Sequence, residues 1–174
     1  MRHAKGYTLT EILFSSVILL LILITVAGAS LMLKNICHAS IVAHTLQRDA
    51  TIIMGYIIKS APAENACTGL RSAASYSLPV VSPAGSAIDF VDPDNTARRY
   101  YLSGNTIMYA SGTIWPSPQA LYTAPANTTV TLLFWPASID GETVGVYVAL
   151  VQSFSGKPIA GSLKTFVNLR NMPK

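Results

Sequence analysis

A stretch of 22 residues without a charge, "ILFSSVILLLILITVAGASLML" from Ile12 to Leu33, is the feature that most constrains this chain. As an α-helix with a rise of ~1.5 Å per residue it is about 33 Å long, enough to cross a hydrocarbon layer of ~30 Å. Of the 174 residues, 51% are hydrophobic and only 11% are charged, and much of the apolar excess lies in this stretch. We therefore expect a transmembrane segment at about residues 12–33 and one globular domain after it.

Charge fixes the expected orientation of that segment. Arg2 and Lys5 lie just before it, so the positive-inside rule places the N-terminus in the cytoplasm and the remaining chain on the other side. The net charge of +4 is mild, and the other basic residues are scattered except for the pair Arg98-Arg99. The distribution is unlike the basic stripe of a nucleic-acid-binding domain, so a nucleic-acid partner is not expected.

Three interpretations of the N-terminus compete. A secretory signal peptide would combine the basic start, the apolar stretch and the small-residue sequence "AGA" at Ala27–Ala29. A plain membrane anchor needs only the apolar stretch. Neither explains Glu11, because a carboxylate at the edge of an apolar segment weakens insertion and is usually there for a task.

The third interpretation rests on "KGYTLTE", Lys5 to Glu11, which closely resembles the signature of type IV prepilins. The resemblance implies a leader of residues 1–6, cleaved after Gly6 by a prepilin peptidase that also N-methylates Tyr7. It further implies that Glu11 of one subunit pairs with the Tyr7 amine of a neighbour in a filament. Phe is commoner than Tyr at the new N-terminus, and Gly28 stands where many members carry Pro.

The helix is expected to continue well beyond the apolar stretch. Apolar residues recur at three- or four-residue spacing through Val42, Leu46, Ala50, Ile53 and Ile57. This amphipathic pattern predicts one helix from about Thr8 to Lys59, within a spine of residues 7–60. The sequence "APAEN" at 61–65 would end it, since Pro62 disfavours helix in the residue before it.

Residues 61–174 are expected to form a head rich in short β-strands. The expected strands are 87–91, 97–102, 105–110, 129–135, 144–152 and 163–169. The second and third flank Ser103-Gly104 as a hairpin, and "IDGET" at 139–143 supplies an Asp-Gly turn. A Pro-rich connection at 111–127 is interpreted as a long loop with a surface or subunit-contact role. The predicted fold class is α+β and pilin-like, a long N-terminal helix packed on an antiparallel sheet.

A second resemblance covers about a third of the chain. The run "IDFVDPDNTARRYYLSGNTIMY" and the terminal "FVNLRN" are similar to the J-type minor pseudopilins of type II secretion and to PilW-type minor pilins. It implies a subunit that primes or caps a filament together with sister subunits. It also implies a single-pass inner-membrane protein with a periplasmic head that later enters a filament. A major pilin of the filament body, or a secreted adhesin with an ordinary signal peptide, remains the alternative.

Enzyme chemistry and cofactors are not expected. His3 lies in the leader, and His38 and His44 are six residues apart, a spacing that places them on different sides of a helix. There is no Gly-rich phosphate loop after a predicted strand and no nucleophile elbow.

One oxygen-rich cluster, Asp89, Asp92, Asp94 and Asn95, contains ligand types that calcium accepts. It lacks the spacing of a calcium loop, and turn chemistry explains it without a metal, so the three carboxylates are only weak metal candidates. Arg98 and Arg99 would point to opposite faces of one strand, which makes a poor groove for a phosphate backbone.

Four further residues carry open expectations. A disulfide between Cys37 and Cys67 is disfavoured, because the helical separation and the return path barely allow the ends to meet. Trp135 is assigned to the core, whereas Trp115 is left open between core and subunit contact. Tyr122 is likewise a core or contact residue.

Overall fold

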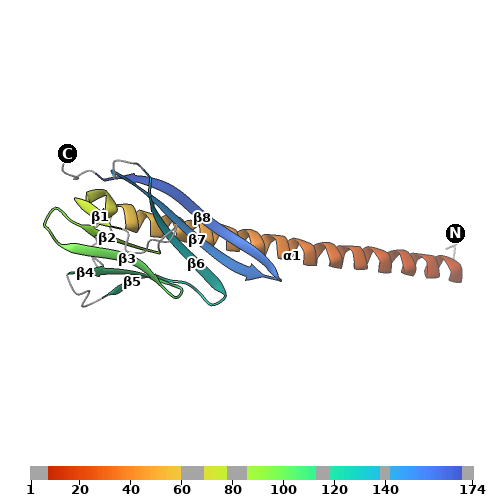
Figure 1. The fold of residues 1–174 in the computed structure, drawn as a ribbon. Helices are drawn as coiled ribbons and strands as arrows, with labels where there is room; N and C mark the ends of the chain where they lie inside the picture. Colours follow the sequence, from red (N-terminus) through yellow and green to blue (C-terminus); the bar gives the residue numbers. More distant parts are fainter. Residues whose placement is uncertain (1–7, 60–68, 78–85, 113–117, 138–141, 170–174) are drawn as a thin grey trace, which may run out of the picture. The chain divides into compact units, whose positions relative to one another are not determined.

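The computed structural model describes residues 8–59, 69–77, 86–112, 118–137 and 142–169. It confirms the α+β class, with one long N-terminal helix packed against antiparallel β-structure (Figure 1). The chain divides into two compact units, Met1–Ile41 and Val42–Lys174, and the division falls inside the helix. The C-terminal part of the expected spine, from Val42 onward, therefore belongs to the compact head.

Helix α1 spans Leu9–Lys59 without interruption, as the apolar stretch and the amphipathic pattern after it predict. Thr8 precedes its first turn and the carbonyl of Thr8 accepts the first helical bond, from the N–H of Ile12 at 3.2 Å. The helix continues unbroken through Gly28. The expected stop at 61–65 lies outside the described residues.

The first sheet is a five-stranded antiparallel meander in the order β1-β2-β3-β4-β5. Its strands are β1 Ser75–Ser77, β2 Ala87–Val91, β3 Ala97–Ser103, β4 Thr106–Ser111 and β5 Gln119–Thr123. The expected β3–β4 hairpin is confirmed, but its turn is Gly104-Asn105, one residue later than the expected Ser103-Gly104. Gly104 takes a φ of +60° there, which favours glycine. A short 3₁₀ helix, η2 at Leu70–Ser72, precedes β1.

One expectation fails in this sheet. The Pro-rich connection at 111–127 is not a single long loop, because Gln119–Thr123 pairs with β4 as strand β5. The prolines that flank this segment, Pro118 and Pro125, lie just outside the strand, where a missing N–H breaks no ladder bond. Residues 113–117, including Trp115, lie outside the described part of the chain.

The second sheet has three antiparallel strands, β6 Thr128–Pro136, β7 Thr143–Phe154 and β8 Lys157–Asn168. β6 and β7 match their expected ranges closely. β8 begins six residues before the expected 163, because a two-residue turn at Ser155-Gly156, with φ of +50° and +75°, joins it directly to β7. The expected Asp-Gly turn, Asp140-Gly141, lies outside the described residues.

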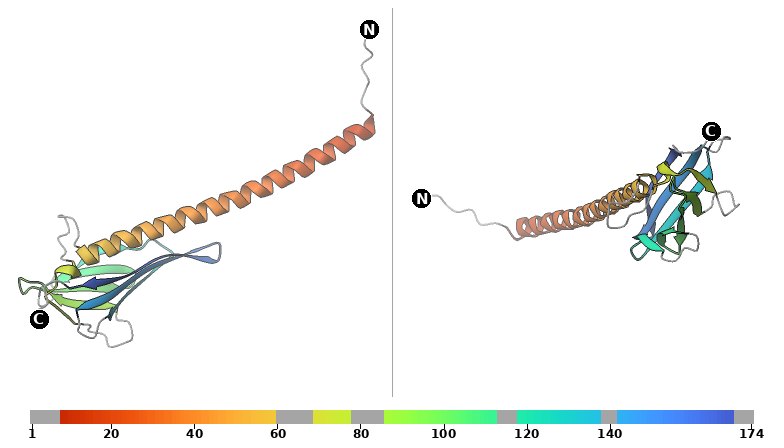
Figure 2. Two further views of the ribbon diagram at one scale, coloured as in Figure 1. Left: turned by 90° about the horizontal axis from the view of Figure 1, so that it is seen from above. Right: turned by 90° about the vertical axis from the view of Figure 1, so that its left-hand side faces the viewer.

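The two sheets and the second half of α1 share one core (Figures 1 and 2). The helix contributes Leu46, Ala50, Ile53, Met54 and Ile57. Both sheets turn alternate residues toward it, with Phe90 and Tyr100 from the first sheet stacked at 5.5 Å between ring centroids. The division of the strands into two sheets is a feature that the sequence pattern does not predict.

Helix α1 and the second sheet approach each other closely at Gly161. A Cβ at this position would lie 2.5 Å from the carbonyl carbon of Leu46 and 2.6 Å from the backbone nitrogen of Gln47. Backbone atoms cannot move aside as a side-chain tip can, so only glycine allows β8 to cross the helix at this distance.

Candidate functional site

The N-terminal edge of α1 carries a reciprocal capping box. The Thr8 N–H donates to Glu11 Oε2 at 2.9 Å, and the Thr8 hydroxyl donates to the same oxygen at 3.0 Å. The Glu11 N–H in turn approaches Thr8 Oγ1 at 3.3 Å. Thr8 is thus the N-cap and Glu11 the N3 residue of a Thr-x-x-Glu box, which satisfies backbone donors that a helix start leaves without partners.

Glu11 therefore has a local role that the sequence interpretation missed, although Thr-x-x-Glu before an apolar run is a known signal for a helix start. Both hydrogen bonds from Thr8 reach Oε2, so the box itself does not use Oε1. The carboxylate is held at a helix N-terminus, where negative charge is favourable. Gly6 and Tyr7, the expected cleavage pair, lie outside the described residues.

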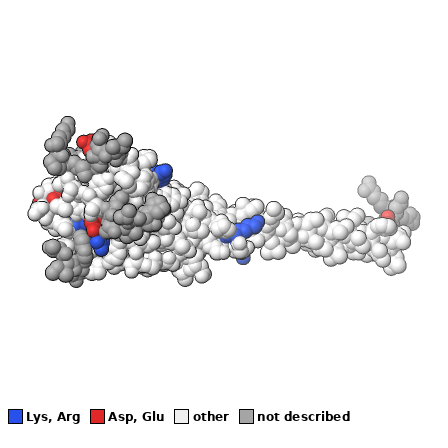
Figure 3. All heavy atoms as spheres, viewed as in Figure 1, with Lys and Arg blue, Asp and Glu red and all other residues white. Residues whose placement is uncertain are grey.

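The first half of α1 is long and apolar enough to cross a membrane, and its 18-residue apolar window has no residue buried by the rest of the chain. On the face drawn in Figure 3, no charged atoms are seen between the acidic N-terminal end of the helix and the basic group near the middle of α1. Three hydroxyl groups in the stretch bond to carbonyls of the preceding turn. These are Ser16 to Leu13, Thr25 to Ile22 and Ser30 to Val26, each at 2.8 Å. Their polarity is thereby satisfied within the helix, as a lipid surrounding requires.

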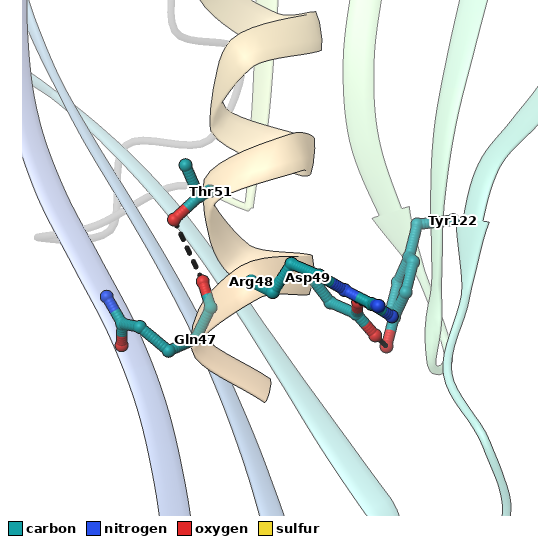
Figure 4. Close-up of polar contacts among 5 residues, drawn as sticks. All are labelled: Gln47, Arg48, Asp49, Thr51 and Tyr122. Carbon is teal, nitrogen blue, oxygen red and sulfur yellow. Dashed lines mark hydrogen bonds and ion pairs between the residues drawn. The ribbon is translucent and has the colours of Figure 1, made fainter. Parts of the chain in front are cut away.

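The second half of α1 is tied to the head by a polar contact (Figure 4). Tyr122 of β5 donates its hydroxyl to Asp49 Oδ2 at 3.5 Å, while Arg48 pairs with Asp49 Oδ1 at 3.1 Å. On the neighbouring turn the Thr51 hydroxyl bonds to the Gln47 carbonyl at 2.9 Å. Burial, with the nearby Asp49 carboxylate, raises the pKa of Tyr122 above its ordinary value. Tyr122 thus belongs to the half-buried border of the head core.

The acidic cluster is divided between two arginines. Asp89 on β2 lies directly opposite Arg99 on β3 and accepts two bonds from its guanidinium, at 2.5 and 2.7 Å. Asp92, only 5% exposed, accepts from Arg98 at 2.8 and 3.0 Å, and Arg98 also donates to the Tyr109 hydroxyl at 2.6 Å. Both carboxylates are therefore used in ion pairs within the head.

These pairs explain the electrostatics of the hairpin. The hydrogen bond to Asp89 raises the pKa of Arg99 despite partial burial. Burial by itself would lower the pKa of Arg98. The contacts of Arg98 with Tyr109 and Asp92 outweigh burial, so its pKa is raised.

Among the described residues no group of three His, Cys, Asp or Glu side chains is placed to hold a metal ion. Asp94 is an exposed turn residue beside Asn95, which takes a positive φ of +60°.

Trp135 corrects one expectation. It lies on the outer face of the second sheet, half-buried, and not in the core. Its ring lies against Gly145, where an added Cβ would come within 2.1 Å of it, and meets Phe166 edge-on at 6.1 Å. The Lys164 ammonium lies 5.0 Å from the Trp135 ring centroid and 5.7 Å from that of Phe166. The alternation of "TVTLLFW" could have predicted this outer position, since Trp135 lies on the same face of the strand as the polar residues Thr129 and Thr131.

The remaining candidate residues are not brought together. Cys37 is an exposed free cysteine, and Cys67 lies outside the described residues. His38 and His44 are exposed on α1, and His3 is not described.

Comparison of the chain with protein-family models, with curated proteins and with solved structures finds no match.

Proposed function

We propose that this chain is a membrane-anchored subunit of a type IV pilin-like filament, of the minor pilin or pseudopilin kind. One observation carries the proposal: a single unbroken helix, Leu9–Lys59, has an exposed apolar first half and a second half that completes the core of a folded head. An ordinary signal peptide is discarded after export, so the head would not need to share a helix with it. A filament subunit needs this continuity, because its anchor later becomes the packing element of the filament.

Glu11 is the residue that links anchoring to assembly. Cleavage after Gly6 would expose a positive amine at Tyr7, one residue before the N-cap Thr8. Because Thr8 occupies Oε2 of Glu11, Oε1 is available to the amine of a neighbouring subunit. A desolvated pair of this kind sets axial register more than it adds net stability.

The proposal includes a topology and a set of partners. The N-terminus lies in the cytoplasm and the head in the periplasm, by the charge asymmetry around the apolar stretch. The partners are a prepilin peptidase that methylates Tyr7, an assembly platform in the inner membrane, and sister pilin subunits. The β3–β4 hairpin, Ala97–Ser111, overlaps the run that resembles J-type and PilW-type subunits.

Two variants of the N-terminal edge test the proposal. Glu11→Gln keeps a residue able to complete the capping box but removes the charge. Glu11→Val removes both. We expect both variants to be processed normally and neither to be incorporated into sheared filaments or to cross-link with sister subunits.

The comparison separates charge from helix capping. Incorporation of Glu11→Gln at the wild-type level would show that the box, and not the charge, is what assembly needs. Incorporation of both variants would remove the pairing role altogether.

A further inference from the structure

β8 is a long open edge of the second sheet. It spans twelve residues and has one strand neighbour, β7, within the described chain. The other outer strands are shorter or lie against the first sheet: β1 has three residues, β5 has five, and β6 contacts β2 and β3. β8 itself contacts the short helix η2, but pairs with no second strand of the described chain. Long open edges are templates for the addition of another strand, so proteins usually shorten or protect them.

The register identifies the backbone groups that face the open edge. The two-residue turn makes Phe154 and Lys157 the closing pair, and antiparallel bonds then alternate along the ladder. Odd-numbered residues of β8 point their N–H and C=O groups at β7, in line with the bond from Leu169 N–H to the Glu142 carbonyl at 2.9 Å. Even-numbered residues point theirs outward. Pro158 is the first of these, at a position where a missing N–H costs no ladder bond.

The side chains beside this edge combine aromatic surface with positive charge. Phe166 is 58% exposed and lies with Lys164 and Trp135 on the outer face. At the far end of β8, an open hollow of about 520 Å³ is bordered by Ile58, by the exposed Arg71 and by residues 165–168. There is room for an added chain at this end of the strand.

The positive charge of β7, β8 and the residues after them favours a negatively charged partner strand. Residues 143–174 contain four basic residues, Lys157, Lys164, Arg170 and Lys174, and no Asp or Glu, so they account for the whole net charge of +4. Pairing β8 of one copy with β8 of another would bring like charges together, which is unfavourable. A segment bearing carboxylates would instead find two cations beside the C-terminal half of the edge, Lys164 and Arg71.

We propose that the edge of β8 binds an extended acidic segment of another polypeptide by strand addition. Main-chain bonds to the edge groups of Ala160, Ser162, Lys164 and Phe166 supply the pairing, and carboxylates of the partner meet Lys164 and Arg71. This inference rests on the open edge and its charge, and it does not depend on membership of a filament.

The test uses the full chain in detergent micelles and two peptides of equal length, TEVEVEVT and TKVKVKVT, each capped at both ends. We expect the acidic peptide to slow hydrogen exchange of the Ser162, Lys164 and Phe166 amides by about tenfold or more, and raised salt to weaken this effect. The basic peptide is expected to leave these amides unchanged.

Two pairs of variants keep the test specific. Ser162→Pro removes an edge donor without breaking a bond to β7 and should abolish protection, whereas Ser162→Ala keeps the donor and should retain it. Lys164→Glu should weaken the binding of the acidic peptide and so reduce the protection of the β8 amides. Lys164→Met should reduce this protection less. Thermal unfolding of each variant verifies that the head is folded.

Four results would overturn the inference. They are equal protection by both peptides, no protection by either, protection located on other strands, and retained protection in folded Ser162→Pro. Dimerisation with β8 protected would make a second copy the occupant. Protection by phosphatidylcholine–phosphatidylglycerol vesicles, but not by peptide, would make this a membrane-facing surface.

Discussion

At the scale of single residues, Glu11 is the most informative position. It borders the apolar stretch, completes a capping box with Thr8 and is the proposed acceptor of a neighbour's amine. These roles are compatible because the box uses one carboxylate oxygen and leaves the other. The box also orients the carboxylate before any neighbour arrives, which lowers the conformational cost of pairing.

Thr8 allows the box to be tested without changing the charge of Glu11. Thr8→Val is expected to lower local helix stability by about 1 kcal/mol, equivalent to roughly fivefold faster exchange of the Glu11 amide. Thr8→Ser keeps the hydroxyl and should exchange at the wild-type rate. Hydrogen exchange in micelles measures both, and equal exchange in all three proteins would show that the box does not stabilise the helix start.

Tyr122 gives a pH-dependent prediction at the same scale. Its pKa is raised by burial and by Asp49, so the folded state favours the neutral phenol. The stability that this contributes is complete below the ordinary pKa near 10 and is lost as the pH rises through the higher folded value. The wild-type head should therefore lose stability in this alkaline range more steeply than Tyr122→Phe does.

Thermal unfolding between neutral and alkaline pH measures this difference. Tyr147→Phe, which alters a half-buried tyrosine on the outer face of β7, serves as the control. The same alkaline loss in Tyr122→Phe as in wild type would exclude the ionisation of Tyr122 as its source.

At the scale of elements, local patterns predict most strands and fail where tertiary contacts decide. The alternation in β7 and the apolar run of α1 are strong signals, and both elements lie where the sequence places them. The start of β8 was missed because Pro158 and Gly161 are typical of loops. The structure gives each a tertiary reason: Pro158 faces an open edge, and Gly161 crosses the helix. β5 was missed because the flanking prolines obscure a short strand.

Gly161 offers the sharpest element-level prediction. Gly161→Ala should destabilise the head by about 1–3 kcal/mol, since the added methyl group meets the backbone of α1 at Leu46 and Gln47. Ser162→Ala alters the adjacent exposed residue and should stay within ~0.5 kcal/mol of wild type. Chemical unfolding in micelles compares the two, and equal stability of both variants would mean that β8 and α1 separate without cost.

At the scale of the whole molecule, the sequence predicts an anchored α+β protein but not the division of its head into two sheets. That division depends on which strands pair across long sequence distances, and local periodicity carries no such information. The candidate site is affected in the same way. Glu11 is visible in the sequence, whereas the ion pairs of Asp89 and Asp92 depend on the register of β2 and β3.

The mass of the mature chain tests the central claim most directly. Protein isolated from cells that make it is measured intact, and its N-terminal peptide is then sequenced by mass spectrometry. The account predicts a chain that begins at Tyr7 with one methyl group on its amine. A chain that begins at Ser30, as cleavage after Ala29 would give, or one that retains Met1–Gly6 in full, would contradict it.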